Sequence, residues 1–141
     1  MPTLKWRHTH HYVKGDAVDV GDVPGHVVGA IQGAGLGFFD SGEVATHSIT
    51  ILHDFTQGSG PHSGYLRYVF EDGSTLSLSF HGKSTTAPGQ TTTAIEGSFS
   101  FTGGTGRFSG VTGNGQYQGR RLIPLAGGGE VYLDFTAAYS T

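Results

Sequence analysis

Hydrophobic and polar residues alternate one by one along most of this chain. In the segment 95–101, isoleucine and phenylalanine at positions 95, 99 and 101 alternate with Glu96, Ser98 and Ser100. A period of two predicts a β-strand with one buried and one exposed face, because successive side chains in a strand point to opposite sides. No stretch of ten residues shows the 3.6-residue period of an amphipathic helix. The pattern therefore predicts an all-β protein.

The same alternation places seven to nine strands along the chain. Strands are predicted at 4–13, 26–32, 36–39, 44–55, 65–71, 75–82, 95–101, 116–118 and 130–139. Tight turns are predicted at 14–16, 40–43 and 72–73, and longer loops at 57–64 and 83–92, where glycine, proline and small polar residues gather. Short connections of this kind favour an up-and-down order of neighbouring strands.

An open sheet of this size has two edge strands, which pair readily with other chains unless the sheet closes on itself. The glycine-rich corner at 103–115 fits closure, because glycine permits sharp bends and close approach of backbones. We therefore expect one domain over residues 1–141. It is predicted to be an all-β closed antiparallel barrel of about eight strands with an apolar central cavity, and a β-sandwich is the structural alternative.

Composition narrows the classes of function. The chain has no cysteine, which excludes disulfides, zinc–thiolate sites and thiol catalysis. A net charge of −3 with 13% charged residues does not fit a nucleic-acid partner. No apolar run reaches the 18 residues typical of a membrane span, so no membrane partner is expected. Residues 1–13 lack the apolar core of a signal peptide, which predicts a cytoplasmic protein.

Four segments carry a resemblance to a known family: GEVATHSITILHDF, QGSGPHSG, GYLRYVFEDGSTLSLSFHG and FSFTGGTGRFSGVTGNGQYQG. They resemble the allene oxide cyclase-like barrels, and dirigent proteins and related bacterial barrels share the GGTGRF-type corner. The resemblance implies a calycin-like barrel of eight strands with an apolar cavity, commonly dimeric or trimeric. It also implies cofactor-free steering of a reactive hydrophobic substrate. The plant cyclases use a carboxylate on the first strand and a pocket cysteine, whereas this chain has His8 and His10 on that strand and no cysteine.

Histidine is the main candidate for chemistry, with eight residues in a chain of few charges. Four histidines are in phase with the apolar faces of their strands and are expected to point into the barrel: His8, His10, His47 and His53. An imidazole in a cavity is an effective general acid or base near neutral pH. We predict His47, His53 and Tyr68 as catalytic residues, such that His47 or His53, together with Tyr68, moves a proton or polarises a carbonyl.

The other side chains on the apolar faces are predicted to bind the substrate and hold it in one reactive conformation. Together with His8 and His10, these wall residues are Trp6, Tyr12, Ile49, Ile51, Phe70, Phe80, Phe99 and Phe101. If the polar faces line the interior instead, the site comprises Arg67, Glu96, Tyr117 and Asp134. The arginines that flank the corner, Arg107, Arg120 and Arg121, are expected to tie down carbonyl groups or to face solvent.

The leading hypothesis is a cofactor-independent cyclase or isomerase that acts on a small hydrophobic substrate of specialised metabolism, as a homodimer or homotrimer. No cofactor and no metal are expected. A lipocalin-like protein that binds a small molecule without catalysis is the alternative. A cupin-like metal enzyme is the third reading, because His8 and His10 share a strand face as cupin ligands do, although the glutamate of that pattern is missing.

Overall fold

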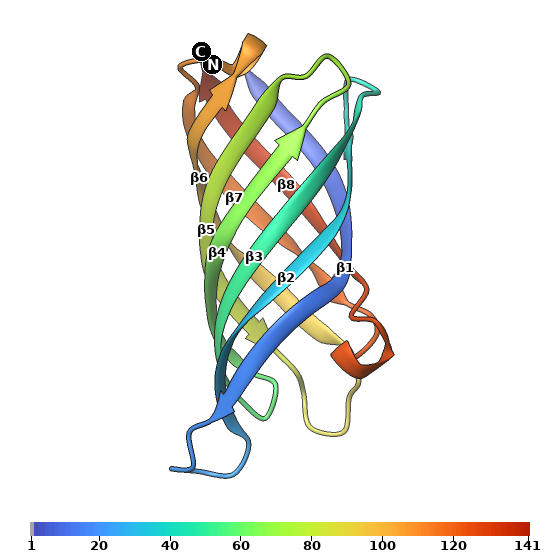
Figure 1. Ribbon diagram of the computed structural model, residues 1–141, viewed down its shortest axis with the longest axis vertical. Coiled ribbons are helices and arrows are strands. Elements are labelled where there is room, and N and C mark those ends of the chain that lie inside the picture. Colours follow the sequence, from blue (N-terminus) through green and yellow to red (C-terminus); the bar gives the residue numbers. More distant parts are fainter. Residues whose placement is uncertain (1) are drawn as a thin grey trace.

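Eight long strands wind around one axis in the structure, a computed structural model that describes residues 2–141 (Figure 1). The strands are β1 (Thr3–Asp19), β2 (His26–Phe39), β3 (Val44–Thr56), β4 (Gly60–Val69), β5 (Thr75–Thr85), β6 (Thr93–Thr105), β7 (Thr112–Arg121) and β8 (Val131–Ser140). Each strand pairs antiparallel with its neighbour in sequence, and β1 pairs with β8. The predicted closed antiparallel barrel is confirmed.

Two short 3-10 turns interrupt the connections: η1 (Gly106–Phe108) before β7 and η2 (Leu125–Gly127) before β8. Within residues 2–141, neither these turns nor any other helix is long and apolar enough to cross a membrane.

Several strands are longer than the sequence pattern predicted. β1 continues through the predicted turn at 14–16, where a register shift between Tyr12 and Lys14 absorbs the irregularity. The segments predicted at 26–32 and 36–39 form one strand, because Gly33 and Gly35 pair with both β1 and β3. β4 begins at Gly60, inside the predicted loop 57–64. Neighbouring strands on both sides hold Gly33 and Gly35 in the sheet, and β5 holds Gly60, so these glycines do not act as breaks.

The up-and-down order divides the connections between the two ends of the barrel. Both termini lie at one end, together with the turns 40–43 and 70–74 and the corner 106–111 (Figure 1). The connections 20–25, 57–59, 86–92 and 122–130 lie at the other end. We call the first the closed end and the second the mouth, because the interior is filled at one and hollow at the other.

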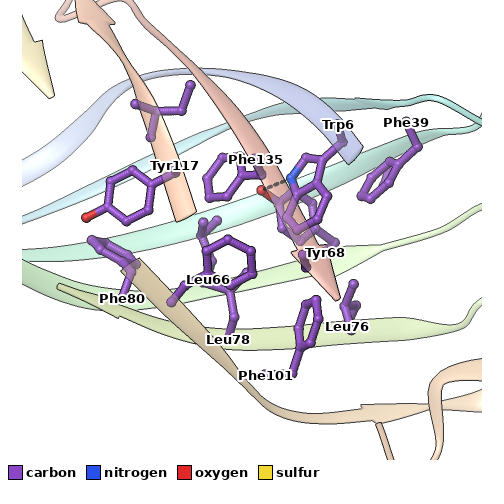
Figure 2. Packing of buried hydrophobic residues seen from close by; sticks show 14 of the residues in the cluster. Trp6, Phe39, Leu66, Tyr68, Leu76, Leu78, Phe80, Phe101, Tyr117 and Phe135 are labelled. Carbon is purple, nitrogen blue, oxygen red and sulfur yellow. Dashed lines mark hydrogen bonds between the residues drawn. The ribbon is translucent and has the colours of Figure 1, made fainter. Parts of the chain in front are cut away.

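Aromatic rings fill the closed half of the barrel. Trp6 stacks on Phe135, with ring centroids 4.8 Å apart, and on Phe39 at 5.1 Å. Its indole Nε1–H donates a hydrogen bond of 2.8 Å to the hydroxyl of Tyr68, drawn as a dashed line in Figure 2. Buried aromatic residues carry a large hydrophobic contribution, and buried tryptophan and tyrosine need such polar partners. This cluster occupies the interior of the closed half.

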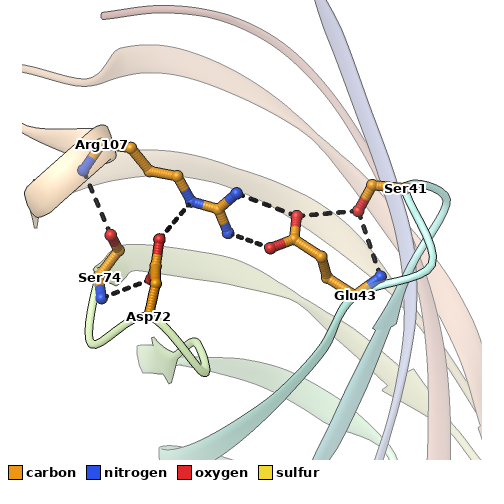
Figure 3. Close-up of polar contacts among 5 residues, drawn as sticks. All are labelled: Ser41, Glu43, Asp72, Ser74 and Arg107. Carbon is orange, nitrogen blue, oxygen red and sulfur yellow. Dashed lines mark hydrogen bonds and ion pairs between the residues drawn. The ribbon is translucent and has the colours of Figure 1, made fainter.

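A set of polar contacts fastens the turns of the closed end (Figure 3). The Arg107 guanidinium donates two hydrogen bonds to the carboxylate of Glu43, at 2.6 and 3.1 Å, and its Nε lies 3.5 Å from Asp72. The backbone N–H of Arg107 donates to Ser74 Oγ at 3.3 Å. One arginine therefore joins the β2–β3 turn, the β4–β5 turn and the corner. The GGTGRF segment serves architecture here, as its glycines indicated.

Candidate functional site

The mouth half of the barrel holds a cavity of about 70 Å³. That is several times the ~10–15 Å³ that one water molecule needs. Every strand contributes to the lining, which is mostly aliphatic and aromatic. Its members include Tyr12, Ile31, Ile49, Ile51, Phe55, Phe80, Ile95, Leu125, Val131 and Leu133. The polar side chains among the lining residues are few, and they include His10, His62, Ser84, Tyr117 and Arg121.

The cavity continues outward into a shallow groove at the mouth. Tyr12, Ile31, Phe55, Arg121 and Leu125 line both spaces. These shared residues come from β1, β2, β3, β7 and η2, so the groove is framed by strand ends and by the β7–β8 connection. A ligand that enters the cavity must pass between them.

A chain of buried hydrogen bonds leads from the packed half to the floor of this cavity. Tyr68 Oη lies 2.7 Å from His8 Nδ1, and His8 Nε2 lies 2.9 Å from His10 Nδ1. Trp6 donates to Tyr68 from the other side. Trp6, His8 and His10 alternate along β1, so one strand face supplies three of the four members. The chain ends at His10, whose ring lines the cavity.

The direction of these hydrogen bonds follows from counting protons. The hydroxyl of Tyr68 accepts from Trp6, and residues 2–141 offer its own proton no acceptor other than His8 Nδ1. His8 then carries its proton on Nε2 and donates it to His10 Nδ1, because a neutral imidazole has one donor and one acceptor nitrogen. His10 therefore carries its proton on Nε2, which has no partner within the described residues. The chain presents an N–H donor to the cavity.

Burial keeps these histidines neutral. Desolvation, followed by the neighbouring His47, lowers the pKa of His10 to about 3. Desolvation also lowers the pKa of His8 well below its usual value, with smaller contributions from His10 and His47. Burial raises the pKa of Tyr68 well above its usual value. All members of the chain are uncharged near pH 7, which supports the proton order given above.

A second polar group lies across the barrel from β1. His62 on β4 bonds through Nε2 to the Tyr117 hydroxyl at 2.6 Å and through Nδ1 to Ser84 Oγ at 2.9 Å. Desolvation lowers the pKa of His62 to about 4, and it raises the pKa of Tyr117. All three residues line the cavity. The cavity thus has two polar walls, both neutral, in a mostly apolar lining.

The structure places only part of the predicted wall set around the cavity. Five of the predicted residues line it: His10, Tyr12, Ile49, Ile51 and Phe80. The other five lie outside its lining: Trp6, His8, Phe70, Phe99 and Phe101. Trp6 and the three phenylalanines belong to the packed aromatic cluster, and Trp6 and His8 belong to the hydrogen-bonded chain. These five side chains are buried in the closed half, where aromatic rings from several strands meet, so their predicted role in binding substrate stays a prediction.

The three residues predicted as catalytic have different positions. Tyr68 is fully buried and acts on the cavity only through His8. His47 stacks on His8 with ring centroids 4.2 Å apart, and its Nε2–H donates to the carbonyl of Thr9 at 2.9 Å. His53 lines the groove at the mouth, stacked on Phe55. None of the three lies among the lining residues of the cavity itself.

Several lining residues were missed by the sequence analysis. His62 and Ser84 fell inside predicted loops. Tyr117 was placed inside only by the alternative interpretation with inward polar faces, and Arg121 was placed inside by neither interpretation. Extending the alternation of Leu66 and Tyr68 backwards along β4 places His62 on the inner face. On β7, residues 116, 118 and 120 are all polar and exposed, so 117 and 121 share the opposite face. Arg67, Glu96 and Asp134 are outward, as the leading interpretation had them.

The cupin-like hypothesis finds no ligand set in the structure. Among residues 2–141, no group of three or more histidine, cysteine, aspartate or glutamate side chains is positioned to hold a metal ion. His8 and His10 share a face, but each uses a ring nitrogen to bond the other. The donor set does not fit a cupin metal centre.

The fold is similar to that of solved dirigent proteins. The pterocarpan synthase dirigent protein GePTS1 superposes with a TM-score of 0.55 at 16% identity, covering 99% of this chain and 86% of that chain. The pterocarpan synthase dirigent protein PsPTS1 gives 0.52 at 16% identity, covering 99% and 97%. No family model and no curated protein matches the sequence.

At this level of identity the likeness establishes the fold alone: a closed barrel of eight antiparallel strands, similar to the barrels of the two dirigent proteins. The finer resemblance to allene oxide cyclases, the dimeric or trimeric state and the cytoplasmic location stay predictions.

Proposed function

We propose that this barrel is a cofactor-independent cyclase or isomerase that binds a small hydrophobic, phenolic substrate in the mouth cavity and controls the stereochemistry of its reaction. The observation that carries the proposal is the buried chain from Trp6 through Tyr68 and His8 to His10. It delivers one oriented N–H donor to a cavity whose lining is mostly apolar. The two dirigent neighbours, named as pterocarpan synthases, support the phenolic class of substrate.

The chemistry follows from this donor. A substrate oxygen accepts a hydrogen bond from His10 Nε2–H, and the bond strengthens as negative charge develops on that oxygen during bond rearrangement. A fixed donor in a dry site stabilises such charge without reorganising solvent. The aliphatic walls, among them Ile49, Ile51 and Leu133, limit the conformations of the bound molecule. Restriction of conformation selects one stereochemical outcome.

The hydrogen-bonded chain can also donate a proton to the substrate and then recover it. If His10 gives its Nε2 proton to the substrate, it regains one at Nδ1 from His8, which in turn regains one from Tyr68. The indole N–H of Trp6 then faces the phenolate. Because burial raises the pKa of Tyr68, the return of the proton is favoured. This cycle suits an intramolecular reaction, in which the substrate neither gains nor loses a proton overall.

Two experiments test the proposal in sequence. Native mass spectrometry of untagged protein, before and after denaturation, is expected to release a small organic molecule. Small phenolic substrates that can close a ring are then offered without cofactor, and products are resolved by chiral chromatography. We expect turnover with one stereoisomer in excess. His10→Gln is expected to lower kcat about 100-fold, with a much smaller change in KM.

His81→Gln is the matched control, because His81 is exposed on the outer surface of β5. It is expected to retain wild-type kcat. Full activity of His10→Gln, or a racemic product, would contradict the proposed role of the chain. Tight binding of phenolic ligands without turnover would identify the lipocalin-like carrier instead.

A further inference from the structure

We propose that Arg121 is an anion-binding residue at the mouth, so that the ligand of this barrel carries a carboxylate or a similar acidic group on an apolar body. The inference rests on the proposed function, since it concerns the same cavity. It adds the class of group that the ligand bears and the orientation in which it enters.

The position of Arg121 sets it apart from the other arginines. It is the last residue of β7, it is partly buried, and it lines both the cavity and the outer groove. Arg7 and Arg107 each form ion pairs with carboxylates on the outside of the barrel. Arg120, one residue earlier, is exposed and donates to the hydroxyl of Tyr132. Among the arginines of residues 2–141, Arg121 alone lines the cavity.

The guanidinium of Arg121 is poorly satisfied. Of its five N–H donors, residues 2–141 supply a partner for one, the bond of 3.0 Å from Nη2 to Thr93 Oγ1. Its Nε is buried and has no hydrogen-bond partner within the described residues. Burying a donor without a partner costs free energy, so such a group marks a place where a ligand can supply the acceptor.

The charge of Arg121 is equally unmatched within residues 2–141. None of the salt bridges of the described chain includes it, although Asp16 lies along the same outer groove. Burial lowers the pKa of this guanidinium, and no carboxylate offsets that effect. Guanidinium binds carboxylate through two parallel hydrogen bonds, which fits the free Nε and Nη groups.

Arg121 and His10 lie on different parts of the same lining, one at the mouth and one at the floor. A ligand with an acidic group at one end and a phenol or carbonyl oxygen further along its apolar body satisfies both. Its acid stays near solvent at Arg121 and its reactive oxygen enters the cavity. Ion pairing at the mouth then fixes which end of the molecule reaches His10.

The test uses two probes that differ only in charge, 4-hydroxycinnamate and 4-hydroxycinnamide, titrated by calorimetry at pH 7.5. Wild-type protein is expected to bind the carboxylate at least about tenfold more tightly than the amide, and this preference should weaken in high salt. Arg121→Gln is expected to remove the preference by weakening carboxylate binding while leaving amide affinity within about twofold. Arg120→Gln, the matched control, should leave both affinities unchanged.

The outcomes separate this inference from the proposed function. Equal affinity of wild type for the two probes, or equal weakening of both by Arg121→Gln, would reject the anion site and leave the cavity proposal standing. If wild-type protein binds neither probe, both the anion site and the proposed function of the cavity are rejected. Since the comparison of probes on wild type needs no variant, a folding defect in Arg121→Gln cannot obscure the result. Arg121→Lys should give an intermediate preference, because it keeps the charge and loses the planar fork.

Discussion

At the scale of single residues, the interior of this barrel is defined by neutral histidines. His8, His10, His47 and His62 are all buried, and for each one burial is the largest cause of a lowered pKa. A neutral imidazole can accept and donate at once, which lets two of them form a chain with Tyr68. The same desolvation that tunes the site also makes the fold sensitive to acid.

The first prediction is a loss of stability between pH 6.5 and pH 4.5. In this range an unfolded histidine, with a pKa near 6.5, binds a proton that folded His10 and His62 do not bind. The unfolded state therefore holds more protons. The free energy of unfolding falls by about 1.4 kcal/mol for each unit by which the pH is lowered, for each buried histidine. His26, whose pKa is raised by hydrogen bonds to Asp22 and Asp54, acts in the opposite sense, but it is a single group near the surface.

Urea unfolding at pH 7.5, 6.0 and 5.0 measures this effect. His62→Gln removes one of the titrating groups and should make the dependence shallower by about 1.4 kcal/mol per unit. The carboxylates paired with arginine, such as Glu43, have lowered pKa values and add their own loss only at more acid pH. A free energy of unfolding that is constant from pH 7.5 to pH 5.0 would show that the histidines are hydrated in the folded state.

At the scale of strands, alternation determines which side chains meet, and small residues determine whether they can. The Tyr117 ring lies over Gly97 on β6 and Gly82 on β5, and an added Cβ at either position would overlap its hydroxyl. The hydroxyl reaches His62 because these two positions carry no side chain. Strand glycines here make room for a long inward side chain.

The sequence could predict the inward faces of β1, β3 and β5 because their apolar residues are large and regular. It could not predict the filling of the closed half, since that depends on rings from several strands meeting at one level, as Trp6, Phe39 and Phe135 do. Nor did it show that His62 belongs to a strand, because the glycines and proline around it are typical of loops. The barrel followed from local pattern, whereas the division into packed half and cavity is set by packing across the barrel.

The prediction at this scale concerns Gly97→Ala. The added methyl group would overlap both the Tyr117 hydroxyl and the backbone carbonyl of His81. It should displace Tyr117, break its bond to His62 and destabilise the fold by about 1–3 kcal/mol, the usual cost of overpacking a core. Urea unfolding measures the loss, and the imidazole resonances of His62 report the broken bond. Gly103→Ala is a matched control on the same strand, because its Cβ would meet no atom within 4 Å. Equal effects of the two substitutions would argue against a specific role for the space at position 97.

At the scale of the whole molecule, the two ends of the barrel have different tasks. The closed end holds the termini, the aromatic cluster and the Arg107 contacts of Figure 3. The mouth holds the cavity, the His10 donor and the unmatched charge of Arg121. Because packed rings separate the ends, stability and ligand binding should respond to different substitutions.

Arg107→Gln tests this separation. It removes a paired hydrogen bond to Glu43 and the stacking of the guanidinium on Phe70 and Phe108, at 4.8 and 4.9 Å from the ring centroids. Both contacts are partly exposed, so solvent screens them, and we expect a loss of about 1–2 kcal/mol in the free energy of unfolding. Arg67→Gln, at an exposed outward position without an ion pair in the described chain, should cost much less.

The same variant should bind 4-hydroxycinnamate with wild-type affinity, because no atom of the mouth is changed. If the two ends are independent, Arg107→Gln lowers stability without lowering affinity. Ligand binding at the mouth then depends only on the strands that frame it. If Arg107→Gln lowers the affinity for the probe as well as the free energy of unfolding, strain at the corner reaches the cavity along β6 and β7. The two ends would then form one cooperative unit, and the positions of His10 and Arg121 would depend on the contacts that fasten the far end.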